Sequence, residues 1–189
     1  MDMQKKLEVT KMKIAISAES TIDLSKELIE KFNINIIPFN IQLGDKGGLD
    51  GEITTDEIIS FVNKTGILPK TSAVNEYQFN EYFTKLHKEY DAIIHFSLSS
   101  ELSATCNNAK NAATNYKNVF IVDTKSLSTG IALLAIYARE LVDEGLSAKD
   151  VYEKCVNRVE KVQASFELKR LDYMHKGGSC SGLTLFAAN

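Results

Sequence analysis

The stretch AIIHFSLSSELSATCNNA, residues 92–109, decides the fold. Its first part, AIIHFSL, is a short β-prone run that predicts a buried strand. The hydroxyl-rich turn SSELS follows, and Ser103 begins a segment with helical character that runs to about Tyr116. A strand that passes through a short loop into a helix is typical of sheets built from parallel strands, because parallel neighbours need crossover connections.

The rest of the chain repeats this alternation. Further strands are expected at 13–17, 34–43, 119–122 and 164–168, and further helices at 24–32, 54–66, 75–90, 130–141 and 147–162. Asp23 is the expected N-cap of the first helix, Pro38 suggests an edge or a bulge in the second strand, and the glycine-rich stretch 44–52 is expected to be a loop. Short strands separated by helices predict a doubly wound α/β fold, with a mostly parallel sheet covered by helices on both faces.

Composition and charge exclude several classes of protein. The chain has 189 residues, 44% of them hydrophobic, with a net charge of −3 and basic residues spread along its length, so nucleic acid is not an expected partner. The three cysteines lie far apart and form no CxxC pair, which argues against disulfides and zinc and fits a reducing cytoplasm. No apolar run approaches the roughly 18 to 20 residues that span a bilayer, so we expect no stable membrane insertion. Residues 1–11 are expected to be a disordered tail.

The serine-rich loop after residues 92–98 is the candidate ligand site. In open α/β sheets ligands bind at the carboxyl ends of the strands, and this loop places several hydroxyls beside backbone N–H groups at the positive end of a helix dipole. Such a site suits a carboxylate or a phosphate. The alternative is that the serines only cap the helix, which one serine would achieve. Thr71 and Ser72 offer a second hydroxyl pair before another helix, and the binding hypothesis requires the two segments to converge.

Other candidate groups give weaker signals. His95 lies within an expected strand, where an imidazole is more often a hydrogen-bonded core residue than a base. His87 falls on a helix, and no spacing ties His175 to a serine and an acid as a triad would require. The glycines of GDKGGLDG match no phosphate-binding motif, and the acidic residues form no metal-ligand pattern, so we predict neither a catalytic residue, nor a cofactor, nor a metal site.

Five segments in order resemble the DegV family over residues 13–182. They are AESTIDL (18–24), PKTSAVNEYQF (69–79), SSELSATCNNA (99–109), VDTKSLSTG (122–130) and LKRLDYMHKGGSCSG (168–182). The third, similar to the family's SSGLSGTYQSA, is the most specific. The sequence departs from the family where Glu19 replaces an Asp, Ala73 and Val74 replace Gln-Pro, Ala104 replaces a Gly and Ser179 replaces an Arg.

The resemblance implies a non-catalytic lipid carrier rather than an enzyme. It implies a Rossmann-like amino-terminal domain at residues 12–164 and, at 165–189, the start of a second, smaller α/β domain that is cut short in the apolar run LTLFAAN. The ligand implied is a long-chain fatty acid between the domains, with its carboxylate held by Thr71 and Ser100 and with Ser72, Ser99 and Ser103 assisting. The partner implied is a separate ATP-dependent fatty acid kinase subunit, to which the carrier presents the carboxylate for acyl-phosphate formation.

Two alternatives remain at this level. One is a phosphotransfer-type enzyme subunit of related fold, in which a histidine such as His95 or His175 would carry the phosphoryl group. The other is an interaction module that keeps the fold without a ligand.

Overall fold

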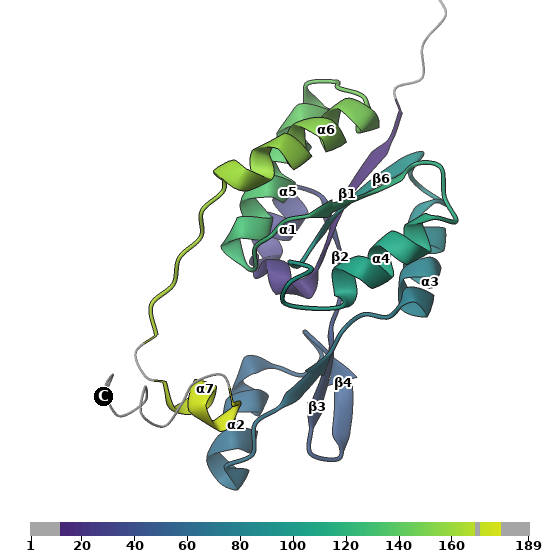
Figure 1. The fold of residues 1–189 in the computed structure, drawn as a ribbon. Helices are drawn as coiled ribbons and strands as arrows, with labels where there is room; N and C mark the ends of the chain where they lie inside the picture. The colour runs from purple at the N-terminus through teal and green to yellow at the C-terminus, as the bar shows by residue number, and fades with distance from the viewer. Residues whose placement is uncertain (1–11, 169–170, 179–189) are drawn as a thin grey trace, which may run out of the picture.

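A four-stranded parallel sheet forms the centre of the computed structural model, which describes residues 12–168 and 171–178 (Figure 1). The strand order is β2-β1-β6-β7. The strands are β1 (Ile14–Glu19), β2 (Ile34–Ile37), β6 (Ala92–Ser97) and β7 (Val119–Asp123). Because β1 and β6 are central and covered on both faces, every residue of these two strands is buried, which explains their nearly continuous apolar sequences.

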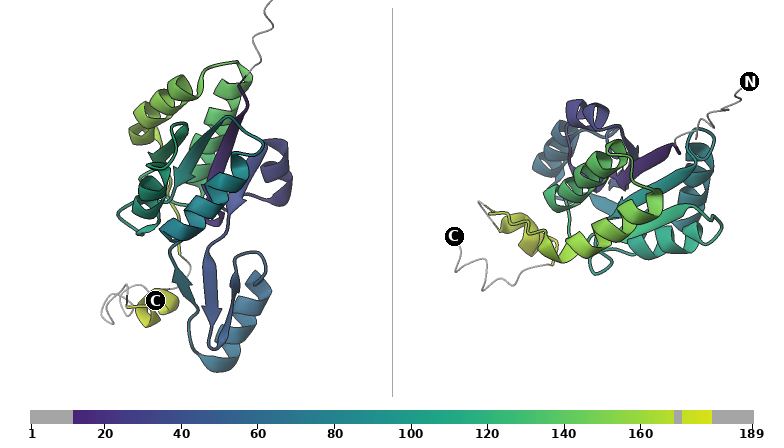
Figure 2. Two further views of the ribbon diagram at one scale, coloured as in Figure 1. Left: turned by 90° about the vertical axis from the view of Figure 1, so that its right-hand side faces the viewer. Right: turned by 90° about the horizontal axis from the view of Figure 1, so that it is seen from above.

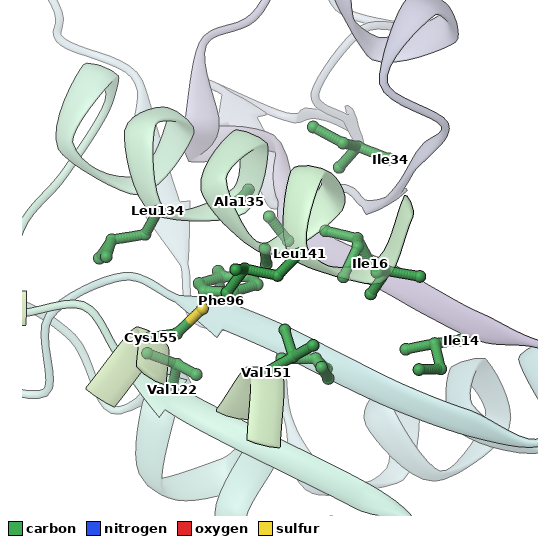
Figure 3. Packing of buried hydrophobic residues seen from close by; sticks show 14 of the residues in the cluster. Ile14, Ile16, Ile34, Phe96, Val122, Leu134, Ala135, Leu141, Val151 and Cys155 are labelled. Atoms are coloured by element: carbon green, nitrogen blue, oxygen red, sulfur yellow. The ribbon is translucent and has the colours of Figure 1, made fainter. Parts of the chain in front are cut away.

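Helices cover both faces of this sheet, as the sequence predicts (Figure 2). The helices around the sheet are α1 (Lys26–Lys31), α3 (Glu76–Leu86), α4 (Thr105–Ala113), α5 (Thr129–Asp143) and α6 (Ala148–Arg158). One core lies between the sheet and α5 and α6, and its buried cluster includes Phe96 and Val122 of the sheet and Leu134 of α5 (Figure 3). The other core lies between the opposite face and α3 and α4, and it includes Phe79 and Phe83.

Local capping explains where most helices begin. The capping box that Asn75 and Gln78 predict is present at the start of α3, and the Ser147 side chain accepts the Asp150 N–H at the start of α6. The prediction that Asp23 caps the first helix is wrong. Asp23 has a left-handed φ of 55° after the short 3-10 turn Ser20–Ile22, and Ser25 caps α1 instead.

A second, small sheet replaces the single strand expected at 34–43. Pro38 separates β2 from β3 (Asn40–Leu43), and β3 lies between β4 (Lys46–Leu49) and β5 (Lys70–Ser72) in an antiparallel sheet of order β4-β3-β5. The expected loop at 44–52 is therefore wrong in part, because a tight turn at Gly44, with φ of 59°, folds β4 back on β3. Helix α2 (Thr55–Thr65) packs Ile58 and Phe61 on this sheet, which lies below the main sheet in Figure 1.

The described residues after α6 include little regular structure. A short 3-10 turn, Val159–Lys161, is followed by residues without helix or strand, so the strand expected at 164–168 is not formed. Helix α7 (Asp172–Lys176) then lies beside the end of α2, where Tyr173 and Val62 line a common hollow. The expected tail at 1–11, the apolar run 183–189 and Ser179 fall outside the described residues.

Candidate functional site

Three polar residues end three neighbouring parallel strands at one edge of the main sheet. They are Glu19 of β1, Ser97 of β6 and Asp123 of β7. The register pairs Ser97 with Asp123 directly. Since ligands of open α/β sheets bind beyond the carboxyl ends of the strands, this edge is the candidate site, and the serine loop after β6 lies along it.

Glu19 is wholly buried at this edge, and its carboxylate accepts three hydrogen bonds. Oε1 accepts from Ser97 Oγ at 2.6 Å and from His95 Nε2 at 3.1 Å, while Oε2 accepts from the Leu98 N–H at 2.9 Å. A buried carboxylate is costly unless donors replace its lost water, and these three donors do so. The sequence analysis did not single out Glu19 as a site residue.

His95 continues this network away from the edge. Its Nδ1 lies 2.9 Å from Ser17 Oγ, which lies 2.9 Å from the Tyr82 hydroxyl. Because Glu19 Oε1 is an acceptor, Nε2 of His95 is the protonated nitrogen, and Ser17 completes the ring's contacts. The side chain is wholly buried, which confirms the prediction of a hydrogen-bonded core histidine. Burial raises the pKa of Tyr82, so its hydroxyl is protonated and can donate to Ser17.

The backbone amides of the serine loop are already occupied. Every N–H from residue 98 to residue 103 donates within the protein. The N–H groups of residues 98, 99, 100 and 101 donate to Glu19 Oε2, Ser126 O, Asp123 Oδ1 and Ser99 Oγ, in that order. Those of residues 102 and 103 both donate to Ser99 O. The expectation of several unpaired N–H groups in this loop is therefore wrong. The loop folds as consecutive tight turns before α4 begins at Thr105, and these turns consume the amides. A ligand carboxylate would have to be held by side chains rather than by these amides.

The hydroxyls of the loop differ in their readiness to donate. Ser99 is 3% exposed and its Oγ accepts from the Glu101 N–H. Ser103 Oγ bonds Thr105 Oγ1 and accepts the Thr105 N–H, which is a capping role. Ser100 is half-buried, and its Oγ accepts a hydrogen bond from Lys125 Nζ at 3.1 Å. Ser100 can therefore donate its own proton to an acidic group, and it is the best placed of the three.

Asp123 and Lys125 surround Ser100. Asp123 Oδ1 accepts the N–H of Ser100 at 3.2 Å and the N–H of Lys125 at 3.3 Å, while Oδ2 lies 3.2 Å from Lys125 Nζ. Burial by itself would raise the pKa of Asp123, but hydrogen bonds from Ser100 and Lys125 outweigh it and hold the pKa at about 2. Hydrogen bonding to Asp123 raises the pKa of Lys125. Both residues lie in the VDTKSLSTG segment, directly after the strand expected at 119–122. Two charged residues at the end of a strand are a sequence signal for this site that the prediction did not use.

Thr71 and Ser72 lie on the small sheet rather than directly before a helix. Both are exposed on edge strand β5, and they line a shallow hollow of about 440 Å³ with Gln42, Gly47 and Lys70. The segment that follows β5 is tied to the main domain, because Asn108 Nδ2 of α4 donates to the Val74 carbonyl at 2.9 Å. The structure thus brings Ser99, Ser100 and Ser103 together in one loop and places Thr71 and Ser72 on a separate element.

A hollow of about 460 Å³, lined by both apolar and polar side chains, adjoins the serine loop. Leu102, Leu127 and Phe166 line it together with Lys125, and these three apolar side chains are 60%, 39% and 73% exposed. Exposed apolar groups of this size beside hydroxyls and a lysine are typical of a surface that receives an amphipathic partner or ligand.

Within residues 12–168 and 171–178, no cluster of three His, Cys, Asp or Glu side chains is arranged to hold a metal ion. None of the helices in the same part of the chain has both the length and the apolar character needed to cross a membrane.

Comparison with known protein families gives one family over most of the chain. The model of the DegV family matches residues 13–189. A fatty acid-binding protein of Thermotoga maritima is 32% identical over 185 residues, which cover 94% of this chain and 64% of that protein. A DegV domain-containing protein of Clostridium perfringens is 29% identical over 93% of this chain and 64% of its own length. The chain thus spans less than two thirds of the length of these relatives.

Solved structures agree with these matches. A fatty-acid-binding DegV family protein from Thermus thermophilus superimposes with a TM-score of 0.77 at 27% identity, over 88% of this chain and 60% of that one. A stearic acid-binding protein from Eubacterium ventriosum gives a TM-score of 0.73 at 26% identity, over 92% of this chain and 63% of that one. The mixed α/β architecture with its parallel four-stranded sheet is therefore the fold of these neighbours.

Proposed function

We propose, from the premise that this chain belongs to the DegV family, that it binds the carboxylate of a long-chain fatty acid and is a non-catalytic lipid carrier. The observation that carries the proposal is the arrangement around Ser100, whose Oγ accepts from Lys125 Nζ at 3.1 Å beside the carboxyl ends of β6 and β7. A hydroxyl that accepts from an ammonium group donates well to an anion. Ser100 and Thr71 would hold the carboxylate, with Ser72, Ser99 and Ser103 assisting.

The acyl chain requires an apolar surface, and the hollow beside Lys125 offers one. Leu102, Leu127 and Phe166 line this hollow together with Lys125, which bonds Ser100, so an alkyl chain whose carboxylate lies at Ser100 would cover them. Each buried CH₂ group contributes about 0.8 kcal/mol, so affinity should rise with chain length. Residues 12–164 would form the domain that holds the carboxylate. Residues 165–189 would begin a second domain that closes over the alkyl chain of the ligand.

A carrier of this kind would act with a separate enzyme. We propose that the chain presents the fatty acid carboxylate, in the cytoplasm, to an ATP-dependent fatty acid kinase subunit that makes the acyl phosphate. Two observations disfavour the phosphotransfer alternative for His95: the ring is 0% exposed, and both of its nitrogens are hydrogen-bonded. A phosphoryl group could reach neither nitrogen without breaking the network to Ser17 and Glu19.

Native mass spectrometry with solvent extraction tests the proposal. The 189-residue chain would be purified beside a form extended by the carboxy-terminal part of a longer DegV relative, and each would be examined before and after addition of dodecanoic acid. A fatty acid of defined mass that is retained at one equivalent supports the proposal. If neither form retains or takes up a fatty acid, the carrier function is wrong. Ser100→Ala should retain less of the fatty acid than the unchanged chain, and Ser60→Ala, an exposed change on α2, is its matched control.

A further inference from the structure

Glu19 is a buried carboxylate whose donors all come from one short stretch of chain. His95 Nε2, Ser97 Oγ and the Leu98 N–H lie within four consecutive residues, at 3.1, 2.6 and 2.9 Å from its oxygens. The side chain is 0% exposed, so it meets solvent nowhere and cannot contact a ligand in this conformation. Its effect on a ligand must therefore pass through the residues that it holds.

The residues that Glu19 holds are the end of β6 and the beginning of the serine loop. The pairing of β6 with β1 ends at Phe96, and its pairing with β7 ends at Ser97. The Leu98 N–H is thus beyond the sheet's pairing, and Glu19 Oε2 gives it an acceptor where the chain turns. Ser99 and Ser100 are the next two residues, so the direction in which their hydroxyls project depends on this turn.

Groups on β6, β1 and α3 fix the Glu19 carboxylate itself. From β6, His95 donates to Oε1, and the ring is held in turn by Ser17 of β1 and stacked edge-on against Phe79 of α3 at 5.2 Å. Tyr82 of α3 bonds Ser17 from the far side. These contacts leave the carboxylate one orientation, with its two oxygens directed at Ser97 and Leu98.

We propose that Glu19 is the positioning residue of the carboxylate site, which sets the serine loop so that the hydroxyls of Ser99 and Ser100 meet a ligand carboxylate. This inference rests on the proposed fatty-acid function and deepens it. The competing reading is that Glu19 stabilises the fold in general and has no particular effect on the recognition of a carboxylate. The two readings differ in whether a change at Glu19 should weaken the binding of an uncharged ligand as much as that of a carboxylate.

Equilibrium dialysis with dodecanoic acid and its methyl ester separates them. The ester has the same alkyl chain and no anionic group, so the ratio of the two affinities reports on the carboxylate site. In Glu19→Gln the side-chain amide presents N–H groups where Leu98 or Ser97 needs an acceptor. We expect the acid-to-ester ratio to fall about tenfold or more, with ester affinity within about twofold of wild type. Glu19→Asp keeps the charge and should recover part of the ratio. Glu27→Gln, exposed on α1, is the matched control.

Each outcome is decisive. If wild type does not prefer the acid, the carboxylate site itself is wrong and the inference falls with it. If wild type prefers the acid and Glu19→Gln keeps the ratio, or weakens acid and ester equally, only the inference is overturned. Should Glu19→Gln fail to fold, Ser97→Ala removes one of the three donors while Glu19 remains, and a fall of about threefold in the ratio is expected. An unchanged ratio in Ser97→Ala, together with rapid hydrogen exchange at the Leu98 amide, would contradict the proposal.

Discussion

Lys125 Nζ donates to Ser100 Oγ at 3.1 Å and lies 3.2 Å from Asp123 Oδ2. One lysine thus links the hydroxyl proposed to hold a ligand to the carboxylate that competes for the same donors. In the ligand-free protein, Ser100 and Lys125 form hydrogen bonds with Asp123, and these bonds lower the pKa of its carboxyl group. A ligand carboxylate at this edge would therefore compete with the Asp123 carboxylate for these donors.

Replacing Lys125 by methionine should weaken fatty acid binding. The change keeps most of the length of the side chain and removes the charge. It leaves Ser100 without its donor, and no cation offsets the charges of Asp123 and Glu101 beside the ligand. We expect Kd for dodecanoate to rise about three- to tenfold, because the site is partly exposed and screened by solvent. Raising the salt concentration should weaken wild type more than the variant. Lys117→Met, on an exposed turn, is the control, and an equal effect there would contradict the assignment.

Replacing Asp123 by asparagine should strengthen binding. The asparagine oxygen can still accept the N–H groups of Ser100 and Lys125, while the loss of charge frees Lys125 Nζ and the Ser100 hydroxyl for the ligand. A gain of about three- to tenfold in dodecanoate affinity is expected from the removal of one nearby anion. A loss of affinity in a folded Asp123→Asn protein would show that Asp123 serves the ligand rather than competes with it.

The same aspartate predicts how stability depends on pH. Its folded pKa, about 2, lies below the ordinary value of 3.8, so its ionised form is stabilised by folding. This contribution is fully present above about pH 4 and is lost as pH falls through about 2. Urea unfolding between pH 2 and 6 should therefore show a shallower acid-side decline in Asp123→Asn than in wild type. Parallel curves would mean that the Asp123 pKa is similar in the folded and unfolded chains.

Gly130 at the start of α5 should not tolerate a side chain. A Cβ there would lie 1.9 Å from Ser126 Oγ and 2.7 Å from Ser126 Cβ, although alanine is otherwise the better helix former by about 1 kcal/mol. The clash should win, and Gly130→Ala should cost about 1–3 kcal/mol in the free energy of unfolding. It should also loosen the Ser99 N–H bond to Ser126 O. Ser126→Gly combined with Gly130→Ala removes both clashing atoms and should recover stability. Equal stability of wild type and the single variant would refute the steric argument.

The sequence predicts the main sheet well because burial on both faces leaves a strong apolar pattern. The runs at β1, β6 and β7 were placed within one or two residues, and Asn75, Thr54 and Ser147 marked helix starts through local hydrogen bonds. The small sheet was missed for the opposite reason. Strand β4 contains two glycines and has no buried residue, so neither periodicity nor propensity distinguishes it from a loop.

The candidate site was predicted by residue type but not by its hydrogen-bond pattern. Runs of serine before a helix signal an anion site, yet the sequence does not tell which amides the loop itself consumes. Two of the partners of those amides, Glu19 and Asp123, come from positions 79 and 23 residues distant in the chain. Such pairings are decided by strand order, which brings β1 and β7 to either side of β6. Thr71 could be placed only after the second sheet was known.

Whether Thr71 and Ser100 hold the same carboxylate is the question that a double-mutant cycle answers. Thr71 is exposed on β5 and Ser100 is half-buried in the loop, and the segment after β5 is tied to α4 through Asn108 and Val74. If one carboxylate receives both hydroxyls, Thr71→Val and Ser100→Ala should each weaken dodecanoate binding about tenfold, and the double variant should lose less than the product of the two. A coupling energy of about 0.5 kcal/mol or more is expected, because the second loss acts on a carboxylate already displaced. Ser60→Ala paired with Ser100→Ala should show none. No effect of Thr71→Val would place the carboxylate at the serine loop alone, and full additivity of two real effects would mean that the two hydroxyls do not act on one carboxylate.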